Sequence, residues 1–349
     1  MRKFLQSIIH WEAWPFGLLY APLAPVWIWY MIKSRAIWFF TPSNPKITFG
    51  GLEGEPKKEM YALLPKHSFP ATFNVLPGVE FDFLLSEINS KGMSYPLIVK
   101  PEVGWQGMLL RKIDDQLQLE RYHQQMTYEY MVQQMVTHPL EVSVFYIRHP
   151  LEDKGTVTGF LQKVPLHVVG NGRDTLQDLV KQHPKAVKRQ IELESKHQPH
   201  WNSVIAEGEK YALSHAANHN RGAHFYDLKE QIDDRLVSVF DAISLKIDDF
   251  FYGRYDIMCR SVEDLKNGEH FSILEYNGCG AEPNHFYDTG YTLFGAYREI
   301  LRHWKALYEI SSHNSRQGIR PWSFLSGARF LYLTRKNTAR MRKLDERIP

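Results

Sequence analysis

Residues 253–278 read GRYDIMCRSVEDLKNGEHFSILEYNG. Two short apolar runs within this stretch, at 255–259 and 271–276, predict β-strands that are joined by a turn. Glu275 and Asn277 are two residues apart, and side chains at this spacing leave the same face of a strand. We therefore expect a carboxylate and an amide oxygen side by side at the end of the second strand.

A third oxygen ligand comes from the first strand, where Asp256 is predicted to lie beside Glu275 and Asn277. Mg²⁺ in proteins prefers one or two carboxylates together with phosphate oxygens, so this set suits a magnesium nucleotide. We expect Arg254 to point to the opposite face and to need a twist or bulge to join the set. The alternative is a group of edge carboxylates that are paired with basic side chains.

A second candidate site lies in the stretch YPLIVKPEVGWQGM, residues 95–108. It predicts a β-hairpin, in which Lys100 ends a buried strand with its ammonium group facing solvent, and Gly104 and Gly107 lie in the turn. A lysine and a glycine-bearing turn can supply a cation and close backbone amides to a triphosphate. The alternative is a hairpin whose lysine and glycines coincide by chance.

The composition of the 349 residues fits two or three packed lobes, because 44% are hydrophobic and 23% are charged. Predicted strands and helices alternate along the chain, which favours an α+β fold. Cys259 and Cys279 cannot form a disulfide framework, and no Cys/His spacing suggests zinc. These features favour a reducing, cytoplasmic compartment and a metal that is held by oxygen.

The N-terminal region is aromatic and interrupted by prolines. Residues 14–32, WPFGLLYAPLAPVWIWYMI, carry no charge and are barely long enough to cross a bilayer as a helix. Pro22 and Pro25 fall inside this span, where lipid offers no replacement hydrogen bonds. We expect a broken, re-entrant or surface-lying hairpin of two short helices. The alternative is a helical pair that packs on the protein's own core.

The C-terminal region joins an apolar, aromatic segment to the basic sequence TRKNTARMRKLDER at 334–347. Residues 316–349 contain nine Lys and Arg against two Asp and Glu, a net charge of +7, whereas the whole chain carries +3. Such a mixture binds anionic lipid surfaces; the alternative is a solvated helix. No nucleic-acid recognition module accompanies it, so no nucleic-acid partner is expected. We expect 11–40 and 322–343 to share one face and to make peripheral or monotopic contact with the cytoplasmic membrane surface.

The ordered motifs VKPEVGWQG, PLEVSVFY, GRYDI and LEYNG resemble the ATP-grasp superfamily, particularly its D-alanine–D-alanine ligases and cyanophycin synthetase-like carboxylate–amine ligases. The resemblance covers roughly residues 90–300 and implies two α+β lobes that grip ATP. The expected organisation is an aromatic membrane-associating segment (1–44), a shortened preceding region (45–90), a small lobe (91–165), a large lobe with the metal site (166–312) and a basic amphipathic tail (313–349).

The same resemblance implies a role for each matching residue. The expected ATP-binding residues are Lys100 at the α- and β-phosphates, Gly104 and Gly107 in the flap, Gln134, Met135 and Val136 at adenine, Glu141 at ribose, and Lys163 and Asn218 in two further nucleotide-binding segments. The expected Mg²⁺ ligands are Asp256, Glu275 and Asn277. Arg254 is expected to steady the transferred phosphoryl group, with Lys100 as the second catalytic cation.

The implied reaction is ATP- and Mg²⁺-dependent ligation. ATP converts a carboxylate to an acyl phosphate with release of ADP, and an amine, or less often a thiol or hydroxyl, then attacks the acyl carbon and displaces phosphate. The acid and amine are expected to be small molecules or lipid-borne. The segment GCGAEPNHF after Asn277 departs from the small-residue loop of the peptide ligases. An ATP-grasp kinase acting on an alcohol, and a nucleotide-binding membrane scaffold without turnover, are the alternatives.

Overall fold

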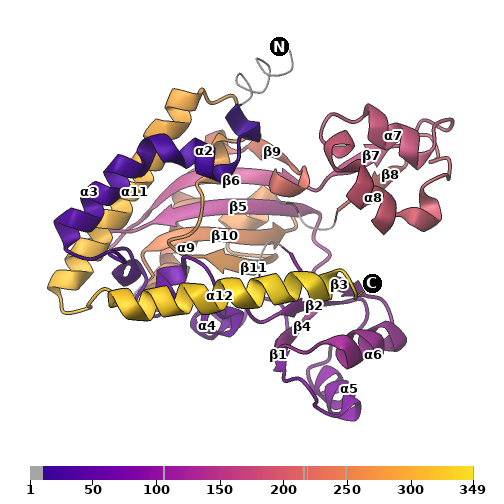
Figure 1. Ribbon diagram of the computed structural model, residues 1–349, viewed down its shortest axis with the longest axis horizontal. Helices are drawn as coiled ribbons and strands as arrows, with labels where there is room; N and C mark the ends of the chain where they lie inside the picture. The colour runs from indigo at the N-terminus through magenta and orange to yellow at the C-terminus, as the bar shows by residue number, and fades with distance from the viewer. Residues whose placement is uncertain (1–10, 105–106, 215–216, 218, 248–249, 349) are drawn as a thin grey trace.

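The computed structural model describes residues 11–104, 107–214, 217, 219–247 and 250–348 (Figure 1). Two antiparallel sheets, of four and five strands, form its framework, and a two-stranded sheet lies in a smaller unit at one side. The helices pack against the sheets and along one side of the molecule. The α+β class predicted from the sequence is confirmed.

The four-stranded sheet belongs to the lobe that carries Lys100. Its strands, in spatial order, are β1 (Thr72–Val75), β4 (Tyr130–Gln134), β2 (Leu97–Pro101) and β3 (Arg111–Ile113). The predicted hairpin is confirmed, because β2 and β3 pair antiparallel. Helices α5 (Phe81–Ser90) and α6 (Gln116–Gln125) contribute Leu84 and Leu119 to the core of this lobe. The short helix α4 (Lys57–Leu63) precedes the sheet in the chain.

The five-stranded sheet belongs to the second lobe. Its strands, in spatial order, are β11 (Phe271–Asn277), β10 (Tyr252–Cys259), β5 (Leu140–Ile147), β6 (Thr156–Val164) and β9 (His224–Asp227). The predicted strands β10 and β11 pair antiparallel, and their connection holds a short helix, α10 (Val262–Lys266), where only a turn was expected. Helix α9 (Asp234–Ile247) buries Phe240 and Ile243 against one face of this sheet.

A small unit follows β6 and lies beside the second lobe in Figure 1. It contains β7 (His167–Val169), β8 (Lys210–Ala212), α7 (Leu176–Gln182) and α8 (Gln190–Lys196). Thr175 and Asp178 form a capping box that begins α7. Its own hydrophobic cluster, which includes Leu176 and Trp201, holds the unit together.

The aromatic N-terminal segment runs alongside the long helix α11 (Leu293–Arg316) (Figure 1). It comprises α2 (Phe16–Tyr20), a 3-10 turn and α3 (Ala24–Ser34), which follow one another without a chain reversal. The expected hairpin is therefore wrong. Pro22 lies in the first turn of the 3-10 helix, and Pro25 lies in the first turn of α3. The backbone N–H groups of a first turn have no acceptor within the helix, so neither proline interrupts the helical path or reverses the chain. Tyr30 stacks on Tyr308 of α11 at 4.5 Å between ring centroids, which ties α3 to the protein's own core.

The C-terminal helix α12 (Phe324–Asp345) bridges the two lobes. Near its start, the Trp38 indole donates to the carbonyl oxygen of Phe324. At its end, Asp345 accepts from the backbone of Leu109 and pairs with Arg111 of the first lobe. None of the helices in the described part of the chain is both long enough and apolar enough to span a bilayer.

Short 3-10 helices complete the chain. They are η1 (Trp11–Ala13), η2 (Ala21–Leu23), η3 (Thr41–Ser43), η4 (Thr48–Gly51), η5 (Ala186–Arg189), η6 (Gln198–His200), η7 (His219–Arg221), η8 (Lys229–Gln231) and η9 (Asn284–Phe286).

Candidate active site

Three charged side chains meet on the face of the five-stranded sheet that is opposite α9. Glu141 on β5, Lys163 on β6 and Asp256 on β10 come from adjacent strands, and Glu141 is paired directly with Lys163. Lys163 Nζ lies 2.7 Å from Glu141 Oε1 and 3.1 Å from Asp256 Oδ1. Burial lowers the pKa of Lys163, but its two carboxylate neighbours outweigh that effect and raise it overall. The sheet thus holds a charged lysine between two carboxylates.

Arg254 joins this group through Asp256. Its Nε and Nη2 atoms lie 3.3 and 3.1 Å from the two carboxylate oxygens of Asp256. The expectation that Arg254 needs a bulge is wrong, because residues two apart on a strand share a face; the register shift of β10 falls after Asp256, next to Ile257. Burial alone would raise the pKa of Asp256, but Arg254 and Lys163 outweigh it and lower the pKa to about 2.

The three proposed metal ligands gather at one end of β10 and β11. Asp256 is paired with Glu275, and Asn277 Nδ2 lies 3.3 Å from Asp256 Oδ2. The Glu275 side chain is 45% exposed, and its ion-pair partner is Lys57 at 3.9 Å. Glu275 therefore has lone pairs available for a cation. These hard oxygen donors fit Mg²⁺.

Lys100 on β2 faces the second lobe. Its Nζ donates to Tyr61 Oη at 3.1 Å, to Gln133 Oε1 at 3.1 Å and to the carbonyl oxygen of Leu274 at 3.2 Å. The expectation of a solvent-facing ammonium is wrong, because Lys100 is only 7% exposed. This burial lowers the pKa of Lys100 to about 8. Since Leu274 immediately precedes Glu275, Lys100 lies beside the strand that carries two of the proposed metal ligands.

Lys57, the first residue of α4, is a cation that sequence reasoning missed. Its Nζ contacts Glu275, and a Cβ atom added to Gly104 would lie 3.0 Å from that same nitrogen. Lys57 therefore lies between the start of the proposed flap and the proposed metal ligands. The only local signal is the glycine-rich segment that precedes it, at 50–54, which was assigned to the shortened region before the grasp lobes.

The remaining predicted nucleotide-binding residues are less closely gathered. Gln134 ends β4 and uses its side-chain amide to bind the backbone of Ser94, while Met135 and Val136 lead from the first sheet to the second. Gly104 and Gly107 flank two flap residues that are not described, and Gly107 adopts a positive φ of 75° that favours glycine. The predicted Asn218 lies outside the described residues.

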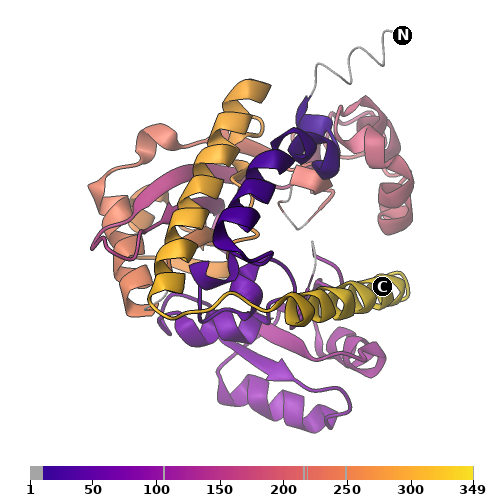
Figure 2. The ribbon, with the colours of Figure 1, turned by 60° about the vertical axis from the view of Figure 1, so that its left-hand side comes forward.

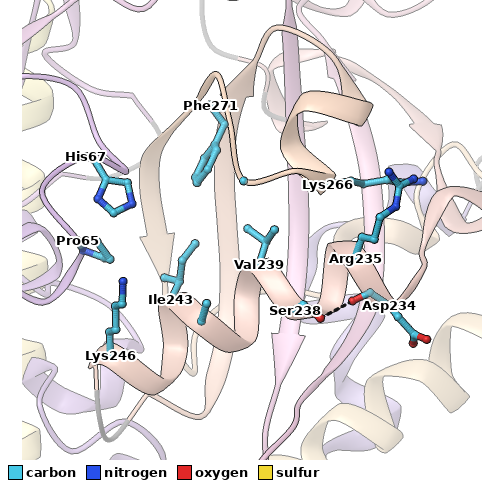
Figure 3. A pocket seen from close by; sticks show the side chains of 12 residues that line it. Pro65, His67, Asp234, Arg235, Ser238, Val239, Ile243, Lys246, Lys266 and Phe271 are labelled. Atoms are coloured by element: carbon cyan, nitrogen blue, oxygen red, sulfur yellow. Dashed lines mark hydrogen bonds between the residues drawn. The ribbon is translucent and has the colours of Figure 1, made fainter.

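A surface hollow also lies beside α9, on the far side of the sheet from Asp256 (Figure 3). Pro65, His67, Lys246 and Phe271 are among the side chains around it. It contains no predicted site residue.

Comparison with known proteins gives distant structural matches only. No family model matches the chain, and no curated protein matches it. Solved structures that are similar to it include a bifunctional glutathione synthetase from Pasteurella multocida, at 15% identity and a TM-score of 0.40. A D-alanine–D-alanine ligase from Bacillus anthracis shows 12% identity and a TM-score of 0.40. The VanG D-Ala:D-Ser ligase from Enterococcus faecalis shows 13% identity and a TM-score of 0.42.

The three matches cover 70%, 75% and 75% of this chain, in the order named. The chain spans 36% of the glutathione synthetase, 67% of the D-alanine–D-alanine ligase and 62% of the VanG ligase. Because these TM-scores lie below 0.5, the assignment of individual residues rests on the chain's own geometry.

Proposed function

We propose that the chain is an ATP- and Mg²⁺-dependent ligase, which activates a carboxylate as an acyl phosphate and joins it to an amine. One observation supports this most: three basic side chains, Lys100, Lys163 and Arg254, converge with Asp256 and Glu275 where the two lobes meet. Such a mixture of fixed cations and hard oxygen ligands suits the transfer of a phosphoryl group.

Each cation has a separate role in this proposal. Lys100 contacts the α- and β-phosphates, and Lys163 and Arg254 stabilise charge on the phosphoryl oxygens as the bond to ADP breaks. Lys57 adds a cation under the flap. Asp256, Glu275 and Asn277 would hold Mg²⁺, which would supply further charge neutralisation on the phosphates.

The nucleotide would occupy the space between the lobes. In this proposal the backbone of Gln134, Met135 and Val136 holds adenine, and Glu141 holds ribose through the oxygen that does not pair with Lys163. Gly104 and Gly107 belong to the flap over the phosphates. Asn218, on the segment before η7, contributes a further contact.

No enzyme nucleophile is needed, since the acyl phosphate is itself attacked by the amine. Cys279, two residues beyond Asn277, is buried, and burial raises the pKa of its thiol, which disfavours the reactive thiolate. An alcohol that attacked ATP directly would instead give a phosphate ester. The kinase alternative is therefore distinguished by its product.

The test is ADP release from the purified full chain with Mg·ATP and fractions of small-molecule and lipid extracts. Active fractions are repeated with hydroxylamine, which traps an acyl phosphate as a hydroxamate that mass spectrometry detects. A hydroxamate and an amide product support the ligase. A phosphate ester would identify the kinase alternative, and absence of ADP with every fraction would favour the scaffold. Glu275→Gln should lower the release of ADP, and Glu230→Gln, at an exposed site in η8, is its matched control.

We further propose that the substrates are presented at an anionic lipid surface. Exposed apolar side chains on α2 and α3 include Phe16, Ile28, Trp29 and Ile32. Figures 1 and 2 show α3 and α12 on the same side of the molecule. One exposed stripe of α12, at helical spacing of three or four, consists of Leu325, Arg329, Tyr332, Lys336, Arg340 and Lys343. Apolar rings beside positive charge complement an anionic bilayer.

Vesicle flotation tests this surface. The full chain should float with vesicles that contain phosphatidylglycerol and remain below with pure phosphatidylcholine. Lys336→Glu with Arg340→Glu should abolish flotation, whereas Lys154→Glu with Lys188→Glu, at exposed sites elsewhere, should not. Equal behaviour of the two double variants, or no flotation of the full chain, would contradict the lipid surface without touching the ligase proposal.

A further inference from the structure

The segment after the last proposed metal ligand is held rigidly by the N-terminal part of the chain. The backbone amides of Cys279 and Gly280 donate to the carbonyl oxygens of Gly50 and Gly51 at 3.0 and 2.9 Å. A Cβ atom on Gly280 would lie 1.9 Å from the carbonyl oxygen of Leu52, so only glycine fits there. This packing fixes the position of the next charged residue, Glu282.

Glu282 lies against Arg254, one of the proposed catalytic cations. Its backbone carbonyl accepts from Arg254 Nη1 at 3.2 Å. The carboxylate points towards the aromatic N-terminal segment, because Glu282 Oε1 accepts from Tyr20 Oη and from Tyr287 Oη, both at 2.9 Å. One oxygen is thus held by two neutral hydroxyls, and Oε2 has neither of these bonds.

Among the described residues, the hydrogen-bond partners of the Glu282 carboxyl group are two neutral hydroxyl groups. Burial raises the pKa of this carboxyl group. The hydrogen bonds from Tyr287 and Tyr20, and then the Arg254 guanidinium, which already binds both oxygens of Asp256, lower it only in part. No Lys, Arg or His among the described residues forms an ion pair with Glu282. A half-buried carboxylate with neutral partners is a site for a cation that arrives from outside.

Aromatic rings surround the Glu282 carboxyl group, so a cation that carries apolar carbon atoms fits beside it. Tyr287 stacks on His219 at 4.2 Å between ring centroids, and Trp11 lies over its ring at 6.1 Å. Tyr20 stacks on Phe16 at 4.2 Å. Because these ring faces stack on one another, the rings form an apolar wall beside Glu282, which can pack against the carbon atoms that carry an ammonium group. A carboxylic acid substrate, in contrast, would be repelled by Glu282.

We propose that Glu282, held between Tyr20 and Tyr287 beside Arg254, binds the protonated amino group of the acceptor substrate. This inference rests on the proposed ligase function and names the chemical class of its second substrate: a primary amine that is cationic when it binds. It also gives the N-terminal segment a role, because Tyr20 of α2 forms part of the acceptor site.

Two probes of nearly equal shape test the charge preference. Benzylammonium and benzyl alcohol are titrated into the full chain and followed by ligand-observed NMR, with no turnover required. The wild-type chain should bind benzylammonium about tenfold more tightly than benzyl alcohol, the scale of a partly desolvated cation site. Glu282→Gln keeps Oε1 as an acceptor for both tyrosines and should remove this preference, while Glu230→Gln should retain it.

Three outcomes overturn the assignment. They are equal binding of the two probes by the wild-type chain, an undiminished preference in Glu282→Gln, and loss of the preference in Glu230→Gln. If Glu282→Gln does not fold, Glu282→Asp replaces it, because its side chain is shorter by one methylene group. Glu282→Asp should weaken the preference for benzylammonium, and an unchanged preference would also overturn the assignment. Mg·ATP binding is measured in parallel. Mg·ATP binding without ammonium preference refutes the acceptor site alone, whereas ammonium preference without Mg·ATP binding refutes the ligase function.

Discussion

The proposed contact of Lys100 with the phosphates, together with the burial of this side chain, predicts that nucleotide affinity depends on pH in a range where ATP itself no longer titrates. The pKa of Lys100 in the nucleotide-free protein is lowered to about 8 because the ammonium group is buried. Phosphate oxygens favour the charged form, so the pKa rises when nucleotide binds. Binding therefore requires proton uptake above pH 8, and affinity falls as the pH rises.

The size of this effect follows from the fraction of Lys100 that is protonated. With a pKa of about 8, that fraction falls from about nine tenths at pH 7 to about one tenth at pH 9, which corresponds to about tenfold weaker binding, or roughly 1.4 kcal/mol. Maintaining the charge in the free protein costs about 3 kcal/mol relative to a solvated lysine, for a shift from 10.5 to about 8. Bound phosphate would offset part of this cost.

Isothermal titration calorimetry with Mg·ATP at pH 7, 8 and 9 measures the predicted loss, and buffers of different ionisation enthalpy report the proton uptake. Lys100→Met should bind more weakly at pH 7 and show no further loss up to pH 9. Lys154→Met, at an exposed turn, is the matched control and should behave like the wild-type chain. A wild-type affinity that is constant from pH 7 to 9 would refute the assignment of Lys100 to the phosphates.

Three further predictions concern single side chains. Glu275→Gln should weaken Mg²⁺-dependent nucleotide binding at least tenfold while leaving the melting temperature within a few degrees, because Glu275 is half exposed; unchanged calorimetric affinity would refute the metal assignment. Burial lowers the pKa of His303 to about 4. The unfolded chain therefore gains a proton between pH 7 and 5 that the folded chain does not, and the free energy of unfolding of the wild-type chain should fall by about 2 kcal/mol over this range. Urea titrations should show a smaller fall in His303→Asn. Asp345→Ala removes the side-chain oxygen that binds Leu109 and Arg111 and helps to fasten α12 to the first lobe. Hydrogen exchange at 107–113 should become faster, and unchanged exchange would argue against this anchor.

Local spacing was enough to predict the parts of the site that lie on neighbouring segments. The period-two geometry of a strand placed Glu275 and Asn277 together, and alternating apolar runs predicted the pairing of β10 with β11 and of β2 with β3. The same rule places Arg254 with Asp256, and the expectation of opposite faces was an error in applying it. The proline-broken helices of the N-terminal segment were predicted, but the reversal between them was not found.

Contacts between distant segments could not be predicted in this way. Lys163 meets Asp256 because β5 lies between β6 and β10, an order that no local pattern encodes. The burial of Lys100 depends on the approach of Tyr61 and Leu274 from other elements. Lys57 belongs to a helix that sequence reasoning left outside the site.

The sequence by itself therefore determined which short segments carry the chemistry, since strand periodicity and glycine turns act over a few residues. Tertiary structure alone decided which charges meet, because strand order and the docking of lobes are set by burial of apolar surface summed over the whole chain. Glu282 shows the difference: its two partners come from residue 20, at the other end of the chain, and from residue 287, five positions away. Only the folded chain brings both hydroxyls to one carboxylate oxygen.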